Sequence, residues 1–169
     1  MAQDRAVLYN GTNWNWTDLG VLPGYSAPSG PFWHDPTGTL YSAGGAYGIS
    51  TSGTIALTAG DYLPATYSSG VISEVPGLPG PPNQGEAFAI SPDGSKIGGY
   101  SGCQLGTCQQ SRAFLYDGSV HYVTTGPGVL FAVNNSGTAA GWFSVGGGVG
   151  WHAFTYASAM LRDITSRKW

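Results

Sequence analysis

Short apolar runs alternate with polar turns along the whole chain, and this pattern predicts β-hairpins. Residues 131–133 (FAV) lead into the turn 134–137 (NNSG), and a second extended run follows at 138–143 (TAAGWF). Asn and Ser favour the early turn positions because their side chains bond nearby backbone amides, and Gly supplies the positive φ that ends the turn. Residues 112–118 (RAFLYDG) and 120–123 (VHYV) follow the same scheme. No segment carries a helical period, because Gly and Pro interrupt every candidate.

One phrase occurs three times with small changes. Residues 46–53 (AYGISTSG), 87–94 (AFAISPDG) and 130–137 (LFAVNNSG) each have an aromatic residue in second place and end in Gly. The aromatic positions are 41 and 43 residues apart, which is about the length that four short strands and their turns occupy. Such a repeat indicates a stack of similar β units, none of which can bury its apolar face alone. Turn chemistry accounts for the phrase, so we interpret it as scaffold.

The hairpins predict an all-β repeat protein of about four four-stranded units, β-propeller-like in form. Hairpins are expected near 6–20, in pairs at 31–58, 64–101 and 112–144, and last near 152–165. We expect a single domain, 1–169, with units near 46–80, 87–126 and 130–165 and a terminal unit at 6–45. A closed four-unit monomer is predicted. The alternatives are an open β arc completed by oligomerisation and a β-solenoid.

The composition indicates the location of the protein and excludes some classes of partner. Charged residues make up 9% of the chain, against about 25% in an ordinary domain. Such a chain stays soluble through Ser, Thr, Asn and backbone groups, which is typical of secreted, β-rich, wall- or matrix-associated proteins, so we expect an extracellular or cell-surface location. The net charge of −3 leaves no basic patch for nucleic acid, and no apolar run reaches the length of a membrane span.

Two cysteines, Cys103 and Cys108, are too few for a structural zinc site, and their spacing differs from the redox motif. A disulfide between them fits an oxidising compartment and is the favoured interpretation; a pair of free thiols is the alternative.

Several phrases resemble the HAF repeats of bacterial extracellular proteins. Residues 152–154 (HAF), 112–118 (RAFLYDG) and 16–24 (WTDLGVLPG) are similar to the His-Ala-Phe strand and the Asp-Leu-Gly phrase of that family, and 131–141 is similar to its following phrase. Only 152–154 keeps the His-Ala-Phe triplet itself. The resemblance covers most of the chain and implies a secreted or surface location and a propeller-like fold. It implies no reaction.

Catalytic chemistry has weak candidates only. His34 and Asp35 form the most concentrated titratable pair, but a turn is the better interpretation of 35–38 (DPTG), and neighbours in a strand point to opposite faces. His152 occupies a repeat position that Arg112 fills elsewhere, which is typical of a polar edge residue. Nothing spaces the histidines for a metal, and we expect no cofactor. A small secreted hydrolase that uses His34 or His152 with an Asp is an alternative function.

Binding is the better-supported function. Sugar recognition uses flat aromatic faces beside polar groups, and alternation places Trp14 and Trp16 on one strand face, each next to Asn. Trp33, Trp142 and Trp151 are further candidates, although each Trp alone is more typical of a core. We predict a secreted, non-enzymatic module that binds a glycan or surface polymer through loop aromatics. A structural or adhesive repeat is the other alternative. Function is expected where the copies differ: in 14–35, in the loop 103–108 and at His152.

Overall fold

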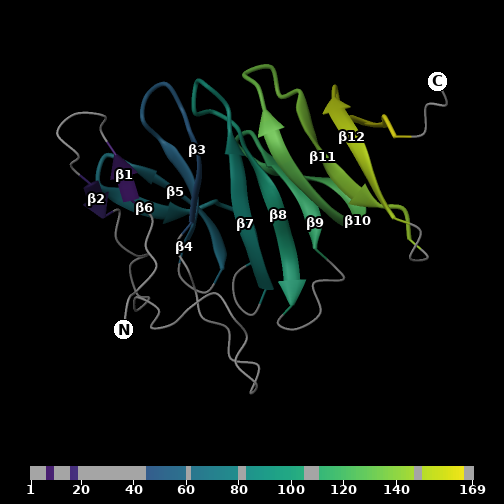
Figure 1. Ribbon diagram of the computed structural model, residues 1–169, viewed down its shortest axis with the longest axis horizontal. Helices are drawn as coiled ribbons and strands as arrows, with labels where there is room; N and C mark the ends of the chain where they lie inside the picture. The colour runs from purple at the N-terminus through teal and green to yellow at the C-terminus, as the bar shows by residue number, and fades with distance from the viewer. Residues whose placement is uncertain are drawn as a thin grey trace.

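The computed structural model describes residues 7–9, 16–18, 45–59, 62–79, 83–104, 111–146 and 150–165 (Figure 1). These residues form strands, turns and bends and no helix, so the predicted all-β class is confirmed. Accordingly, the described part of the chain has no long apolar helix that could cross a membrane.

The first half of the chain contributes two antiparallel sheets. β1 (Val7–Tyr9) pairs with β2 (Trp16–Asp18), which confirms the hairpin expected near 6–20. Four further strands pair in chain order, each antiparallel to the next. They are β3 (Gly45–Ile49), β4 (Ile55–Ala59), β5 (Leu63–Ser68) and β6 (Val71–Glu74).

The second half forms one seven-stranded antiparallel sheet, again in chain order. Its strands are β7 (Asn83–Ile90), β8 (Ile97–Gln104), β9 (Arg112–Tyr116), β10 (Val120–Val133), β11 (Ala139–Ser144), β12 (Trp151–Ala157) and β13 (Met160–Asp163). Short turns join most neighbours, which is why consecutive strands lie side by side.

The long strand β10 belongs to two groups of four strands, β7–β10 and β10–β13. Val120 to Tyr122 pair with β9, and after an irregularity Pro127 pairs with β9 again. Gly128 to Val133 then pair with β11. The boundary expected between units near 126–130 therefore falls inside a continuous strand. The other hairpins expected within the described residues are present, and the strands expected in 31–44 lie outside them.

The groups β3–β6 and β7–β10 each bury apolar side chains on both of their faces. In β4, Leu57 enters one apolar cluster, whereas its neighbour Ala56 faces the opposite cluster with Ala87 of β7. In β9, Phe114 shares that second cluster, while Leu115 points the other way. Because side chains alternate along a strand, an uninterrupted apolar run supplies both faces of a sheet that is covered on both sides.

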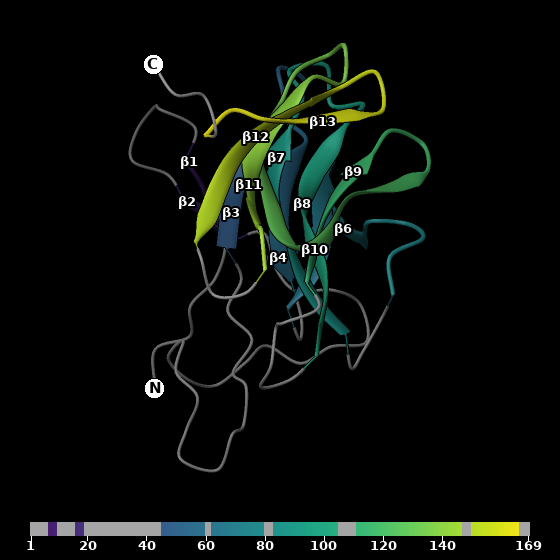
Figure 2. The same ribbon diagram turned by 90° about the vertical axis from the view of Figure 1, so that its right-hand side faces the viewer.

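The third apolar cluster lies between the two parts of the seven-stranded sheet. Leu115 of β9 packs there with Leu130 of β10 and Phe154 of β12. The second part of the sheet thus folds over the first (Figure 2). The described strands β3–β13 form three layers: β3–β6 is the first, β7–β9 with the first part of β10 is the second, and the rest of β10 with β11–β13 is the third. In this arrangement, corresponding strands of successive layers lie next to one another, which positions the site described below.

Candidate functional site

The three copies of the repeated phrase form three hairpin turns of the same design. The turns occupy residues 50–54, 91–96 and 134–138, between paired strand ends. In each, the glycine amide donates to the carbonyl oxygen of the first turn residue, and the glycine has a φ near +80°. The first residue's side-chain oxygen accepts a second amide near the end of the turn. The turn chemistry expected from the sequence is therefore confirmed.

Hydrogen bonds also connect these turns to one another. The backbone amide and the hydroxyl of Thr51 both donate to the carbonyl oxygen of Pro92, at 2.7 and 2.6 Å. The amide of Asp93 donates to Asn135 Oδ1 at 3.0 Å. Figure 1 shows the β3–β4, β7–β8 and β10–β11 turns side by side at the upper edge. Equivalent positions in successive copies are thus neighbours in space.

The aromatic residue of each copy is the extra residue of a β-bulge. On β3, Ala46 and Gly48 pair with consecutive residues of β4, which leaves Tyr47 unpaired between them. The register of β7 shifts in the same way around Phe88, and that of β10 around Phe131. A bulge bends the strand and redirects the side chain of the extra residue, and bulges are frequent next to functional sites.

The three bulge aromatics form a continuous row of rings, called the aromatic row below. The ring centroids of Tyr47 and Phe88 are 4.7 Å apart, and those of Phe88 and Phe131 are 5.4 Å apart. The outer members remain open to solvent: Tyr47 is 44% exposed and Phe131 is 51% exposed. Rings at these separations stabilise each other by edge and tilted contacts. The chain therefore presents an ordered, partly exposed aromatic surface across three strands.

A carboxyl group lies beside one end of the aromatic row. Glu86 of β7 accepts a hydrogen bond from the Tyr100 hydroxyl at 3.2 Å and a second from Tyr47. Burial raises the pKa of Glu86, and the two tyrosine hydroxyls oppose that rise. Burial, together with the nearby Glu86 charge, raises the pKa of Tyr47 to about 12 and also raises that of Tyr100. The hydroxyls consequently remain neutral donors at physiological pH.

Tyr62 adds a strained backbone position to this group. Its φ is +59°, which is rare for a bulky residue, and its carbonyl oxygen accepts the Gly85 amide at 2.7 Å. Burial and the charge of Glu86 also raise the Tyr62 pKa. Strain of this kind costs on the order of 1–3 kcal/mol and tends to occur at functional sites.

The predicted ligand-binding residues Trp142 and Trp151 do meet. Their ring centroids are 4.2 Å apart at an interplanar angle of 68°, on strands β11 and β12. Trp151 is 61% exposed. By alternation along β11, Trp142 lies on the opposite sheet face from the partly buried Phe143, which packs against the apolar cluster of β9 and β10. This pair is a second exposed aromatic surface, although its edge-on rings do not form a flat platform.

The weak catalytic candidate His152 has a carboxylate partner. Its Nδ1 lies 2.6 Å from Asp163 Oδ2 of β13, and its ring contacts Phe143 edge-on. Asp163 Oδ1 also accepts the Thr165 amide at 2.8 Å, so this carboxylate helps to order the chain after β13. A hydrolytic triad further requires a hydroxyl or thiol on the other imidazole nitrogen. No such hydrogen bond to His152 is found among the described residues.

The remaining sequence candidates lie outside the described residues or are described by backbone alone. Trp14, Trp33, His34, Asp35 and Cys108 fall outside. Trp16 lies in β2 and Cys103 in β8, without a described side chain, so the expected disulfide and the Trp14–Trp16 surface stay predictions. Within the described part of the chain, no group of three His, Cys, Asp or Glu side chains could hold a metal ion.

Comparison of the chain with known protein families, with characterised proteins and with solved structures finds no match. The aromatic row was not singled out by sequence reasoning, which assigned the repeated phrase to scaffold. The available signal was an aromatic residue at the same place in all three copies. Its exposure depends on the bulges, and these follow from strand register.

Proposed function

We propose that this protein is an extracellular, non-enzymatic binding module that holds a glycan or a similar surface polymer on its aromatic row. The observation that supports this most directly is the exposure of Tyr47 and Phe131 in one line with Phe88. Folded proteins ordinarily bury large aromatic side chains, and ordered exposed ones mark interaction surfaces.

The chemistry of the row suits a sugar. A pyranose ring has an apolar C–H face that packs on an aromatic ring and hydroxyl groups around its edge. Near the row, Glu86 can accept a hydroxyl hydrogen, and the Tyr47 hydroxyl can donate or accept. Binding sites of this type combine apolar surface with a few placed polar groups.

The periodicity of the row favours a polymer over a single small molecule. Phe88 and Phe131 occupy equivalent bulges on neighbouring layers, and Tyr47 occupies the third. A ligand with a repeating unit can make the same contact at each ring, so contacts add along its length. The row runs from layer to layer, and we expect the polymer to lie across the strands.

The propeller-like repeat architecture is part of this proposal. Two observations support it: four-stranded groups in chain order, and hydrogen bonds between equivalent turns such as Thr51 to Pro92. The resemblance to HAF repeats and a secreted or surface location belong to the same hypothesis. In Figure 1, β1–β2 and β12 lie at opposite ends of the long axis, which favours the open arc over a closed monomer. Light scattering tests this: a monomer in solution would contradict completion of the arc by oligomerisation.

Binding to an array of glycans and to insoluble polysaccharides tests the function. Phe131→Ala is expected to weaken the best binding by roughly tenfold, because one stacked ring contributes about 0.5–1.5 kcal/mol beyond the area it buries. Trp151→Ala is the matched control, since it removes a similarly exposed aromatic residue that is not part of the aromatic row.

Three results distinguish the possibilities. Loss of binding in Phe131→Ala alone supports the aromatic row. Loss in Trp151→Ala alone would instead place the site at Trp142 and Trp151, two of the ligand-binding residues that the sequence predicted. No binding to any glycan, or binding indifferent to both changes, would contradict the proposal and favour a structural or adhesive repeat.

A hydrolase is the second candidate, favoured by the 2.6 Å contact of His152 with Asp163. A panel of ester and glycoside substrates tests it. Activity that disappears in His152→Ala, in a variant with an unchanged unfolding midpoint, would support this function. Absence of any turnover, or turnover that His152→Ala leaves intact, would reject it.

A further inference from the structure

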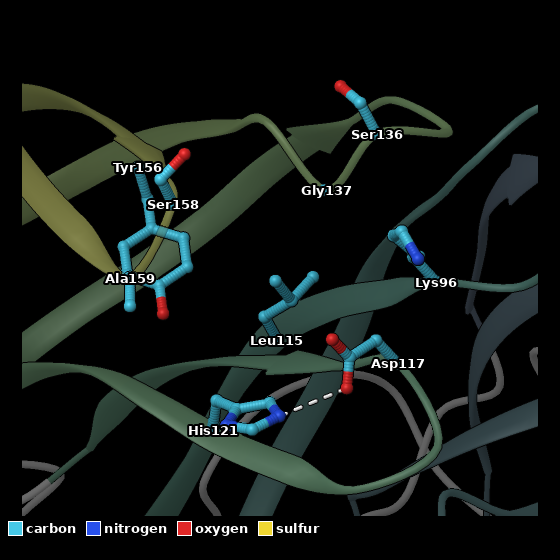
Figure 3. Close-up of a pocket in the computed structure, with 9 residues that line it drawn as sticks. All are labelled: Lys96, Leu115, Asp117, His121, Ser136, Gly137, Tyr156, Ser158 and Ala159. Atoms are coloured by element: carbon cyan, nitrogen blue, oxygen red, sulfur yellow. Dashed lines mark hydrogen bonds and ion pairs between the residues drawn. The ribbon is translucent and has the colours of Figure 1, made fainter.

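A polar pocket of about 260 Å³ opens between the second and third layers, and no residue of the aromatic row lines it. Figure 3 shows Lys96 and Asp117 on one side of it and Tyr156 and Ser158 on the other, with Leu115 at the base between them. The residues come from four turns or strand ends that are far apart in the sequence. The pocket therefore exists only in the assembled fold.

This pocket lies at a point where the copies of the repeat differ. The middle turn, 91–96, is one residue longer than the turns at 50–54 and 134–138. Lys96 is the last residue of the longer turn, and the two shorter turns have Thr there. A repeat protein is expected to depart from its regular pattern where a functional site has been added to the scaffold.

The charged groups of the pocket are available to a ligand. Lys96 makes no ion pair within the described part of the chain, and its stem packs along Gly137. Asp117 Oδ1 and the Ser119 hydroxyl both lie 3.0 Å from His121 Nε2, which orients the imidazole and the carboxylate together. The second oxygen of Asp117 is left to accept further hydrogen bonds.

The opposite wall is a strained turn that carries hydroxyl groups. Ser158 and Ala159 have φ of +51° and +60°. These values are typical of the two-residue hairpin turn that normally contains Gly. The corresponding turn of the first layer has Ser69 and Gly70. Retention of a non-glycine residue in this conformation costs about 1–2 kcal/mol. It places the Ser158 hydroxyl at the rim, opposite Lys96.

We propose that this pocket binds a small hydroxyl-rich carboxylate of the uronic acid type, independently of the aromatic row. The ligand's carboxylate would pair with Lys96, and its hydroxyl groups would donate to Asp117 and exchange hydrogen bonds with Tyr156 and Ser158. The Asp117 carboxylate disfavours a compact dianion such as phosphate more than a monoanion, because the repulsion between like charges grows with the charge of the ligand. A neutral sugar would leave the Lys96 ammonium without its partner.

Titration of the full chain with glucuronate, glucose and inorganic phosphate, followed by amide NMR at low ionic strength, tests the proposal. Glucuronate is expected to shift the amides of residues 96, 117 and 158. Lys96→Gln should weaken glucuronate binding by about tenfold and leave glucose unchanged, because it removes one charge-assisted hydrogen bond. Asp117→Asn should weaken both sugars.

Arg162→Gln is the matched control, since Arg162 is an exposed cation of β13 outside the pocket. It should leave all three titrations unchanged. The proposal is overturned if glucuronate shifts no pocket amide at tens of millimolar, if Lys96→Gln and Arg162→Gln weaken it equally, or if phosphate binds more tightly than glucuronate. The spectrum of residues outside the pocket verifies that each variant is folded.

Discussion

Thr51 donates two hydrogen bonds to a single atom of the next copy of the repeat, the carbonyl oxygen of Pro92. The two residues are separated by 41 positions in the sequence. A backbone amide and a hydroxyl that converge on one carbonyl hold the two turns at a defined spacing. The same spacing keeps the rings of Tyr47 and Phe88 in contact.

The Thr51 hydroxyl can be removed without altering the backbone bond. Thr51→Val is expected to lower the free energy of unfolding by about 0.5–1.5 kcal/mol, the net worth of one hydrogen bond. Thr138→Val is the control, because within the described part of the chain the Thr138 hydroxyl hydrogen-bonds only to Ser136 of its own turn. Urea denaturation measures both. Equal losses would mean that the bond between turns contributes nothing of its own.

Glycine opposite a bulge is required by close backbone contact. A Cβ on Gly141 would lie 1.9 Å from the carbonyl oxygen of Val129, and a Cβ on Gly99 would lie 1.8 Å from that of Glu86. Gly141→Ala should destabilise by roughly 1–3 kcal/mol, the usual cost of overpacking. It should also weaken binding by the aromatic row, because the bulge holding Phe131 must shift.

Gly126→Ala is the matched control for that change. A Cβ there would meet nothing within 4 Å, and the residue has no positive φ. Its unfolding free energy should stay within about 0.5 kcal/mol of the wild type. A Gly141→Ala protein as stable as Gly126→Ala would contradict the register that defines the third bulge.

The strained turn at Ala159 predicts a stabilising substitution. Ala159→Gly should raise the free energy of unfolding by about 0.5–1 kcal/mol, because relief of the left-handed strain exceeds the entropy gained by the unfolded chain. Ala157→Gly, two residues earlier at the end of β12, should have the opposite sign. Thermal unfolding of both variants gives the comparison, and a destabilised Ala159→Gly would contradict the strain.

The partly buried carboxyl group of Glu86 predicts a pH dependence of stability. Its folded-state pKa lies above the ordinary value of 4.5, so the folded protein binds a proton that the unfolded chain releases. The free energy of unfolding therefore falls as pH rises through the window between the two pKa values. Glu86→Gln lacks this titration.

Measurements at about pH 4 and pH 7 test this sign. The stability of Glu86→Gln relative to wild type should improve from the lower to the higher pH. The amide oxygen of Gln can still accept from the Tyr100 hydroxyl, which keeps the variants comparable. A relative stability that declines with pH would show that the hydrogen bonds from Tyr47 and Tyr100 outweigh burial.

Much of the fold was predictable because its determinants are local. The Ser91-Pro92-Asp93-Gly94 turn follows from side chains that bond adjacent amides and from a glycine at positive φ. The apolar run of β9 predicts a strand without any knowledge of the elements that it packs against. The continuity of β10 was not predictable. The residues around Pro127 do not indicate whether the chain breaks there or continues as one strand that pairs first with β9 and then with β11.

The candidate site was less predictable because its contacts join residues that are distant in the sequence. Trp142 and Trp151 were selected for their residue type, and their contact depends on the pairing of β11 with β12. The pocket at Lys96 required four segments to meet, which no local pattern encodes. Strand register and layer packing are cooperative properties of the whole chain.

By itself, the sequence determined the strands, the hairpin turns and the repeat of about forty residues, since all three depend on neighbours along the chain. Only the tertiary structure decided which side chains of the repeat come together at the surface. It placed an extra residue in each bulge and aligned Tyr47, Phe88 and Phe131 into one exposed row. The physical reason is that a shift of one residue in register changes the face to which a side chain points, and register is set by packing between distant strands.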